Sequence, residues 1–323
     1  MKRRTFMHGA AMVAALVASP ELVAQTKFPA KAITFVVPFA PGGGGDTVAR
    51  LLAKGLQDRL NNPVVVENRA GAGGNIGAAS VMKSPPDGHT LLNISSTYAI
   101  QAALGRPSFD PLNDMQPIIV VAREPVILVV HPAASWQNAK DLALAARKSP
   151  GTISHGSAGP GSVAHMGMEE LAYRMGVQLL HVPYKGSSAA FTDLLGQNVN
   201  LVMTTVTFAM PHIKAGKVRA IGIAGSQRLS TLPDVPTFAE QGWPEYQVFD
   251  WKAVAGPKGI PADVVVQLNR ELNEVLKQRT VVDKFEAEGT TLVGGTPEQM
   301  MQLVRGDVAR WKTLTQKAQI KIE

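Results

Sequence analysis

The sequence predicts an α/β protein of two domains, and three observations lead to that prediction. Short apolar runs alternate with amphipathic stretches along the 323 residues, as strands alternate with helices in proteins built on parallel or mixed sheets. A chain of this length is large enough to build two cores. No long linker rich in Ser, Gly or Pro separates two halves, so we expect the chain to cross between the domains in strands.

Ten apolar runs are expected to form strands, with helices in most of the gaps between them. A helix after Ser187 is expected to end at Gly196 in a left-handed cap. Thr296 and Gln299 have capping-box spacing and should open a last helix around Trp311, which is expected to pack on the first domain. The expected strands are 33–37, 64–67, 90–95, 117–122, 126–131, 152–157, 178–182, 200–205, 219–225 and 249–256.

Residues 1–24 have the pattern of an export signal, with a basic head, a short apolar segment and the small residue Ala24 at the end. Such a segment is too short for a stable membrane span and is removed after export. We therefore expect a periplasmic protein that begins at Gln25. The adjacent Arg3 and Arg4 leave the secretory and the twin-arginine routes both open.

Composition excludes several classes of site. The chain has no cysteine, so disulfides, thiol nucleophiles and thiolate metal sites are excluded. The net charge of +7 becomes +5 when the signal takes away three cations (Lys2, Arg3, Arg4) and one anion (Glu21). A modest positive charge helps to attract small anions. The basic residues do not form the stripe that nucleic acid needs, so no nucleic-acid partner is expected.

The stretch "PFAPGGGGDTVAR" (38–50) places four glycines between an expected strand and an expected helix. It is not a phosphate loop, because Asp46 stands where that motif needs a lysine. It also fails the dinucleotide fingerprint, which needs glycine where Thr47 stands. The second glycine-rich loop, residues 70–78, fails the same fingerprint at Ile76. No nucleotide cofactor is expected.

Hydrolase and metal motifs are incomplete as well. A nucleophile elbow needs a glycine two residues before and after the serine. His155 precedes Ser157 at that position, and Pro160 precedes Ser162. No pair of histidines has the helical spacing of zinc ligands with a carboxylate, so no metal is expected. A periplasmic serine hydrolase using Ser157 or Ser162 stays open as a weaker alternative.

Two strand–loop–helix junctions of the same kind occur at 33–50 and 152–175. Both loops are rich in small residues and lead into a helix N-terminus, where free N–H groups and the positive helix end attract carboxylates. If each loop belongs to one domain, the two can hold the ends of a small dianion across a cleft. The alternative, that both are only tight turns, stays open because glycine suits such turns.

Six stretches, in this order, make the chain resemble the periplasmic solute receptors of tripartite tricarboxylate transporters, the Bug family. They cover nearly the whole of the chain after the signal, so they are specific for family and less so for ligand. The stretches are "PFAPGGGGDTVAR", "VVVENRAGAGGNIGAASVMKSPPDGHTLL", "GSAGPGSVAHMGMEEL", "HVPYKGSSAAFTDLLGQNVNLVM", "PHIKAGKVRAIGIAGSQR" and "LPDVPTFAEQG".

The resemblance implies a type II periplasmic binding-protein fold, with two α/β domains that close around a ligand cleft. It implies one domain made of 25–124 with 248–323, and a second made of 125–247. It also implies a monomeric, non-enzymatic receptor that captures a small carboxylate and delivers it to membrane transporter subunits. A ligand-responsive partner of a membrane sensor would use the same cleft and stays open as an alternative.

The resemblance also implies a ligand site. Two of its glycines would donate backbone N–H groups, and two serines would donate hydroxyl hydrogen bonds. Asp46 is expected to cap its helix rather than touch an anion. His165 would either donate to the ligand or be a buried structural residue, and Phe39 would either cover the ligand or fill the core. The implied residues are Phe39, Gly43, Gly44, Asp46, Ser96, Thr97, Ser157, Ala158, Gly161, Ser162, His165, Thr204, Thr205 and Phe208.

One segment departs from the family pattern. Where many members read roughly "FDNLPSALPHIKAG", this chain reads "MTTVTFAMPHIKAG" (203–216). The acidic position, which suits an amino group or an ordered water, is Thr204 or Thr205 here. An amino acid is therefore disfavoured as ligand relative to a plain mono- or dicarboxylate. Val206 and Phe208 make this side more apolar, so an aromatic or longer-chain acid also stays open.

Overall fold

The computed structural model of the protein describes residues 28–105 and 109–318, so the expected signal peptide lies outside the described residues. The helices and strands are, in chain order, β1 (Ile33–Val37), α1 (Gly44–Leu60), β2 (Val64–Asn68), the 3₁₀ turn η1 (Ala72–Gly74), α2 (Asn75–Met82), β3 (Thr90–Ser95), α3 (Ser96–Ala103), β4 (Met115–Val130), α4 (Ala139–Lys148), β5 (Ser154–Ser157), α5 (Val163–Met175), β6 (Leu180–Pro183), α6 (Ser187–Leu195), β7 (Leu201–Thr205), α7 (Val206–Lys214), β8 (Arg219–Ile223), β9 (Phe249–Pro257), α8 (Ala262–Leu276), α9 (Arg279–Ala287), β10 (Thr291–Gly294) and α10 (Pro297–Ala318).

The strands form one mixed sheet in the order β2-β1-β3-β9-β4-β7-β5-β6, with β8 and β10 also paired to β4. Strands β1, β2 and β3 are parallel, and so are β5, β6 and β7. Strand β9 lies antiparallel between β3 and β4. The predicted α/β fold is confirmed, and each half of the sheet carries its own parallel strands.

Strand β4 crosses from one half to the other. The sequence predicts two strands, 117–122 and 126–131, but they form one strand of 16 residues. Glu124 and Pro125 look like a break in the sequence, yet they continue the ladder opposite Asp250 and Phe249 of β9. Beyond them β4 pairs with β7 and β8 of the second half. The expected strand crossings near Val126 and Phe249 therefore correspond to β4 and β9.

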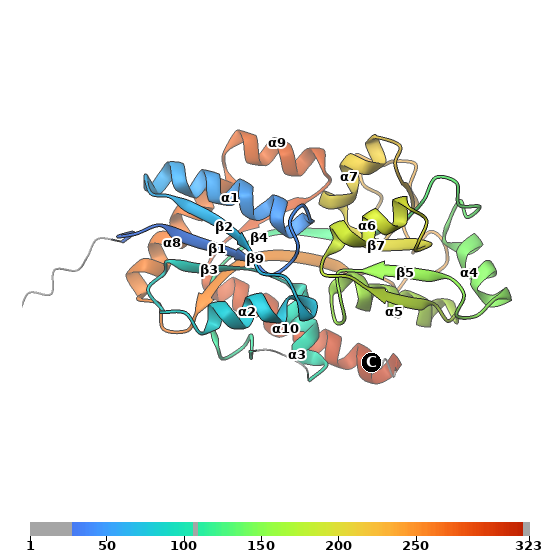
Figure 1. Cartoon of the computed structure of the whole chain (residues 1–323), viewed down its shortest axis with the longest axis horizontal. Coiled ribbons are helices and arrows are strands. Elements are labelled where there is room, and N and C mark those ends of the chain that lie inside the picture. Colours follow the sequence, from blue (N-terminus) through green and yellow to red (C-terminus); the bar gives the residue numbers. More distant parts are fainter. Residues whose placement is uncertain (1–27, 106–108, 319–323) are drawn as a thin grey trace, which may run out of the picture.

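Helices cover both faces of the first half. Residues alternate between faces along a strand, so Phe35 of β1 packs in a core with α1 and α8 while Val36 packs in another with α2 and α10. In Figure 1, α1 lies above these strands and α2 and α10 lie below them. The second half repeats the arrangement, because Leu128 of β4 faces α4 and α5 while Ile127 faces α6 and α7.

The last helix joins the two halves. Its start has the predicted capping box, in which Thr296 N–H donates to Gln299 Oε1 (2.8 Å) and Gln299 N–H donates to Thr296 Oγ1 (3.3 Å). Met300 then packs in the core of the first half, but Trp311 packs in the core with α4 and α5. As expected, helix α10 packs on the first half, where it contacts α3 and β4. Its 22 residues are about 33 Å long, so Trp311 also reaches the core that contains α4 and α5.

The end of helix α6 differs from the prediction. Helix α6 does not end in a left-handed glycine: Gly196 has φ −80°, and the residue with positive φ is Gln197 at 57°. The expected cap is therefore displaced by one residue. Within the described parts of the chain, no helix is both long enough and apolar enough to cross a bilayer.

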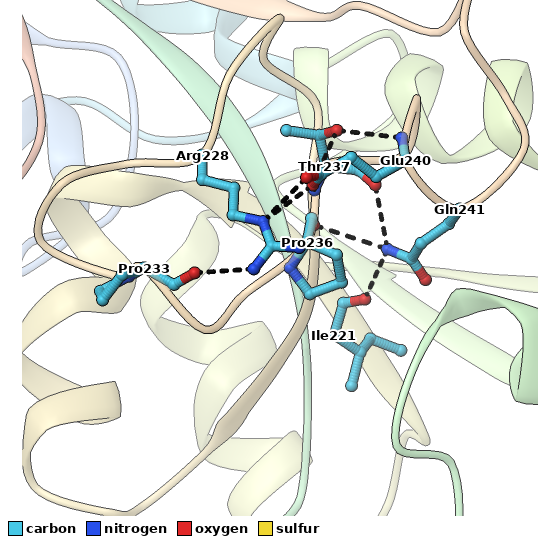
Figure 2. A network of polar contacts seen from close by, with 7 residues as sticks. All are labelled: Ile221, Arg228, Pro233, Pro236, Thr237, Glu240 and Gln241. Carbon is cyan, nitrogen blue, oxygen red and sulfur yellow. Dashed lines mark hydrogen bonds and ion pairs between the residues drawn. The ribbon is translucent and has the colours of Figure 1, made fainter.

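A polar network holds the stretch "LPDVPTFAEQG" to the second half (Figure 2). Arg228 Nε donates to both carboxylate oxygens of Glu240, each at 3.0 Å. Glu240 in turn accepts the N–H of Thr237 (2.7 Å). Gln241 Nε2 donates to the carbonyl of Ile221 in β8 (3.1 Å). These bonds give the stretch a structural role.

Candidate functional site

A cavity lies between the two halves, at the carboxyl ends of the parallel strands. Ligands of open α/β sheets bind at this edge, where loops connect strands to helices. The cavity has about 620 Å³ of empty space, open solvent at its mouth included. It is lined by Phe39, Gly43, Gly44, Gly45, Asp46, Asn93, Ser95, Thr97, Ala158, Ser162, Val163, Ala164, Ser187, Thr204, Thr205, Asp250 and Lys252.

Five helices begin at this cavity. Helices α1, α3, α5 and α7 have their N-cap residues Gly43, Ser95, Ser162 and Thr205 in the lining, and α6 contributes its first residue, Ser187. Helix N-termini carry unsatisfied N–H groups and a partial positive charge. The N-terminus of α7 already has an anion, because Thr207 N–H donates to Glu124 Oε2 (2.8 Å). The other four can act on a ligand.

The glycine loop before α1 is fixed by Asp46. Its carboxylate accepts hydrogen bonds from Gly42 N–H (2.9 Å), Arg50 Nε (3.0 Å) and Asn68 Nδ2 (2.9 Å). Burial raises the pKa of Asp46, but the hydrogen bonds from Arg50, Gly42 and Asn68 outweigh burial and hold that pKa below its usual value. Gly42 has φ 79°, a conformation that favours glycine. Asp46 therefore fixes the loop before α1. It does not cap the helix as expected, because its backbone hydrogen bond comes from Gly42 in the loop and α1 has no side-chain cap.

Gly43 and Gly44 do not need glycine for their backbone angles. Gly43 has an ordinary extended conformation, with φ −77°. At Gly44 the constraint is space, since an added Cβ would lie 2.7 Å from Thr205 Oγ1 at the start of α7. Glycine at 44 thus lets the start of α1 approach the opposite half of the molecule.

Two hydroxyl groups in the cavity wall can act on a ligand. Ser162 Oγ accepts the N–H of His165 (3.3 Å) as the N-cap of α5, which leaves its hydroxyl proton available as a donor. Thr204 is 1% exposed and lines the cavity, and its Oγ1 has no hydrogen-bond partner in the described structure. An unpaired hydroxyl at such a depth costs free energy unless a ligand or water satisfies it.

The two halves touch across the cavity. Ala40 N–H donates to the carbonyl of Lys185 (3.1 Å), and Ser188 Oγ donates to the carbonyl of Pro41 (3.0 Å). Farther in, Val163 N–H donates to Thr97 Oγ1 (3.4 Å). Contacts of this kind join loops from opposite sides of the cavity, so the structure has the closed arrangement of the two halves.

Most of the predicted site residues meet at this cavity. Those in the lining are Phe39, Gly43, Gly44, Asp46, Thr97, Ala158, Ser162, Thr204 and Thr205. Five others do not line it. Ser96 donates its hydroxyl hydrogen bond to Asp250 Oδ1, and Phe208 packs edge-on against Phe191, with ring centroids 4.8 Å apart. The other three, Ser157, Gly161 and His165, belong to a buried histidine cluster.

That cluster explains why the three residues face away from the cavity. The rings of His155, His165 and His181 stack, and the centroids of His165 and His181 are 3.7 Å apart. Ser157 Oγ lies 2.7 Å from His181 Nε2, and Gly161 N–H donates to His165 Nδ1 (3.1 Å). Burial lowers the pKa of His165 to about 3 and that of His181 to about 4. His165 and His181 are therefore neutral at pH 7, and His165 is buried without lining the cavity.

Sequence reasoning missed Asp250 and Lys252, two charged residues of the lining that come from the crossing strand β9. The signal for Lys252 was present, because it is the one basic residue inside the apolar run "FDWKAVAG". Buried lysines are rare unless they are paired. Asn93, which donates to the carbonyl of Gly45 (2.6 Å), was missed as well. No cluster of three or more metal-ligating side chains occurs among residues 28–105 and 109–318.

Comparison with known proteins identifies the family. Residues 48–320 match the tripartite tricarboxylate transporter family receptor. The chain belongs to this family. The Bordetella pertussis protein BugT is 37% identical over 326 residues, covering 100% of this chain and 99% of BugT. The resemblance found in the sequence is thereby confirmed.

Solved structures of similar proteins also resemble this receptor. The periplasmic binding protein BugD superposes with a TM-score of 0.88 at 34% identity, covering 91% of this chain and 99% of BugD. An R. palustris protein solved with adipate has a TM-score of 0.87 at 32% identity, over 91% and 99% of the two chains. MatC from Rhodopseudomonas palustris with bound malate has a TM-score of 0.86 at 31% identity, over 89% and 99%. The two-domain binding-protein fold of the receptor is thus confirmed.

Proposed function

We propose that this receptor captures a small carboxylate in the cavity between its halves and delivers it to a tripartite tricarboxylate-type membrane transporter. The main support is the convergence of helix N-termini on a cavity between the two halves that no arginine or histidine lines. Backbone N–H groups at helix ends are natural carboxylate sites. The carboxylates bound by the R. palustris protein and by MatC, adipate and malate, agree with this chemistry.

The proposed ligand contacts follow from the lining. Gly43 and Gly44 at the start of α1 would hold one carboxylate oxygen through backbone N–H groups. Ser162 would donate from the opposite half, and Thr204 would use its unpaired hydroxyl. Because the contacts come from both halves, the ligand would favour the closed form. We propose that the receptor acts as a monomer and needs no cofactor.

The positions of Ser157 and Ser162, the two serines of the hydrolase alternative, also favour binding over catalysis. Ser157 contacts His181 but has no exposed surface and does not line the cavity. Ser162 lines the cavity and serves as a helix cap. The matching family and the similar solved proteins are solute-binding proteins. A sensor partner would share this cavity, so capture of transporter subunits from membranes, with and without ligand, separates transport from sensing.

The test starts with the ligand itself. Mass spectrometry of small molecules released from the purified receptor is expected to find a carboxylic acid, and calorimetric titration then gives its Kd. Gly44→Val should weaken binding at least about tenfold, that is, by about 1.4 kcal/mol, because its side chain would collide with Thr205. Lys54→Ala, on the exposed face of the same helix, is the control and should bind like wild type. A folded Gly44→Val with unchanged affinity would contradict the proposed clamp.

A further inference from the structure

A buried ion triad lies at one wall of the cavity, where β4 and β9 cross between the halves. Lys252 Nζ donates to Glu124 Oε1 (2.8 Å) and to Asp250 Oδ2 (2.6 Å). The side chain of Lys252 is 4% exposed, that of Glu124 1% and that of Asp250 5%. Lys252 and Asp250 line the cavity, whereas Glu124 does not. The triad therefore presents a donor and an acceptor, side by side, to whatever the cavity holds.

The ammonium group of Lys252 has more N–H donors than acceptors around it. An ammonium group has three N–H donors, and the described structure supplies Lys252 with two acceptors, Glu124 and Asp250. The two carboxylates hold the ammonium in place, and Ser96 donates to the second oxygen of Asp250. Burial lowers the pKa of Lys252, but the charges of Asp250 and Glu124 outweigh burial and raise it above its usual value. Lys252 is thus a charged donor with one hydrogen bond left to give.

The charge of the triad restricts the group that can accept this bond. One ammonium and two carboxylates leave a formal charge of −1 at a buried position. A second carboxylate there would meet this charge at low dielectric constant, where repulsion between like charges is strong. A ligand ammonium would instead meet the fixed charge of Lys252 and could not accept its proton. A neutral group that both accepts and donates a hydrogen bond fits both residues.

Resting on the receptor function proposed above, we propose that the ligand is a hydroxycarboxylate whose hydroxyl accepts from Lys252 and donates to Asp250. The helix N-termini hold its carboxylate. Thr204, with its buried and unpaired hydroxyl on the same cavity, supplies a further partner for the polar groups of the ligand. Lys252 and Asp250 therefore determine which carboxylates the receptor selects.

The first experiment measures this selectivity with pairs of acids that differ by one hydroxyl group. The probes are propanoate and lactate, butanoate and 3-hydroxybutanoate, and succinate and malate, with alanine as the amino analogue of lactate. In calorimetric titrations we expect at least one pair in which the hydroxy acid binds wild type about tenfold tighter or more, as a hydrogen bond to a charged group allows. Alanine is expected to bind more weakly than lactate.

The second experiment tests the residues. In Asp250→Asn the shape is kept and the Lys252–Glu124 pair stays intact, so this variant is expected to fold even if Lys252→Gln does not. The ratio of the two Kd values in the selective pair should fall at least about fivefold in Asp250→Asn and in Lys252→Gln. Binding of succinate should also improve in Asp250→Asn, because the triad becomes neutral. Lys258→Gln and Asp234→Asn, which change exposed residues, are the matched controls.

The outcomes separate this inference from the receptor function. If carboxylates bind without any preference for the hydroxyl, or if folded Asp250→Asn keeps the full preference, the inference is wrong and the receptor function stands. If alanine binds tighter than lactate, the triad selects an ammonium instead and the inference is wrong. If none of the probes and no acid released from the protein binds, the receptor function fails and the inference fails with it.

Discussion

Ser162 combines a structural and a ligand-binding task at the start of α5. Its oxygen caps the helix by accepting the N–H of His165, while its hydroxyl proton is available to the cavity that it lines. A single substitution therefore changes two quantities, stability and affinity, which can be measured separately.

A comparison of two substitutions at Ser162 separates its effect on stability from its effect on affinity. Ser162→Ala should weaken binding of the recovered acid by about 1.5–3 kcal/mol, the free energy of a hydrogen bond to a charged group, and should destabilise the fold by about 1 kcal/mol through loss of the cap. Ser162→Gly should weaken binding equally but cost only a few tenths of a kcal/mol in stability, because glycine is a tolerated N-cap. Calorimetry measures the affinity and thermal melting measures the stability. Wild-type affinity in both variants would show that Ser162 does not contact the ligand.

At the residue scale, sequence predicts the loops of the site better than the direction of each side chain. Gly43, Gly44 and Ser162 line the cavity, as expected of small residues between a strand and a helix N-terminus. Ser157 ends β5 and His165 lies in the first turn of α5, on either side of the second loop. Their partners nevertheless come from β6 and from the loop itself rather than from the cavity. Lys252 was missed because its meaning depends on Glu124, which lies 128 residues away in sequence.

At the element scale, apolar runs that are buried on one or both faces predict the strands. The residues at which each strand begins and ends are predicted less accurately. The merger of two predicted strands into β4 could not be foreseen, because the ladder across Glu124 and Pro125 depends on the distant β9. The short β10 has only four residues, with alternating burial and two of them exposed. Such a strand carries too little apolar sequence to be recognised without its partner.

Trp311 gives a test of the proposed domain layout, which places 25–124 with 248–323 in one domain and 125–247 in the other. Its ring is fully buried in the core that contains Leu128 and Met166, so α10 should stabilise the second domain although the proposed layout assigns it to the first. Trp311→Ala should destabilise the protein by about 3–5 kcal/mol, as expected for a large buried side chain. Hydrogen exchange should show the loss of protection in α5 and β7.

The matched control for Trp311→Ala is Met300→Ala, in the same helix. Met300 packs in the core of the first half, so its loss should expose β1 and β3 to exchange instead. The layout would be wrong if both variants lost protection in the same strands, or if residues 260–323 exchanged together with 125–247 as one unit.

At the scale of the whole molecule, the proposed periplasmic location can be tested through the mass of the chain. Protein taken from the native host should have lost residues 1–24 and should begin at Gln25, which intact-mass measurement detects. Replacing Arg3 and Arg4 by lysine should block a twin-arginine route and leave the secretory route working. A full-length product found in the cytoplasm would contradict the proposal.

The central position of β9 has a consequence for the order in which the chain can fold as it is made. Strand β9 lies between β3 and β4, but the ribosome makes it more than 110 residues after β4 ends, as the two ranges show. Until then, the growing chain holds β3 and β4 without the neighbour that joins them, and contacts so distant in sequence form slowly. The sheet of the first half therefore stays incomplete until the chain has been made as far as β9.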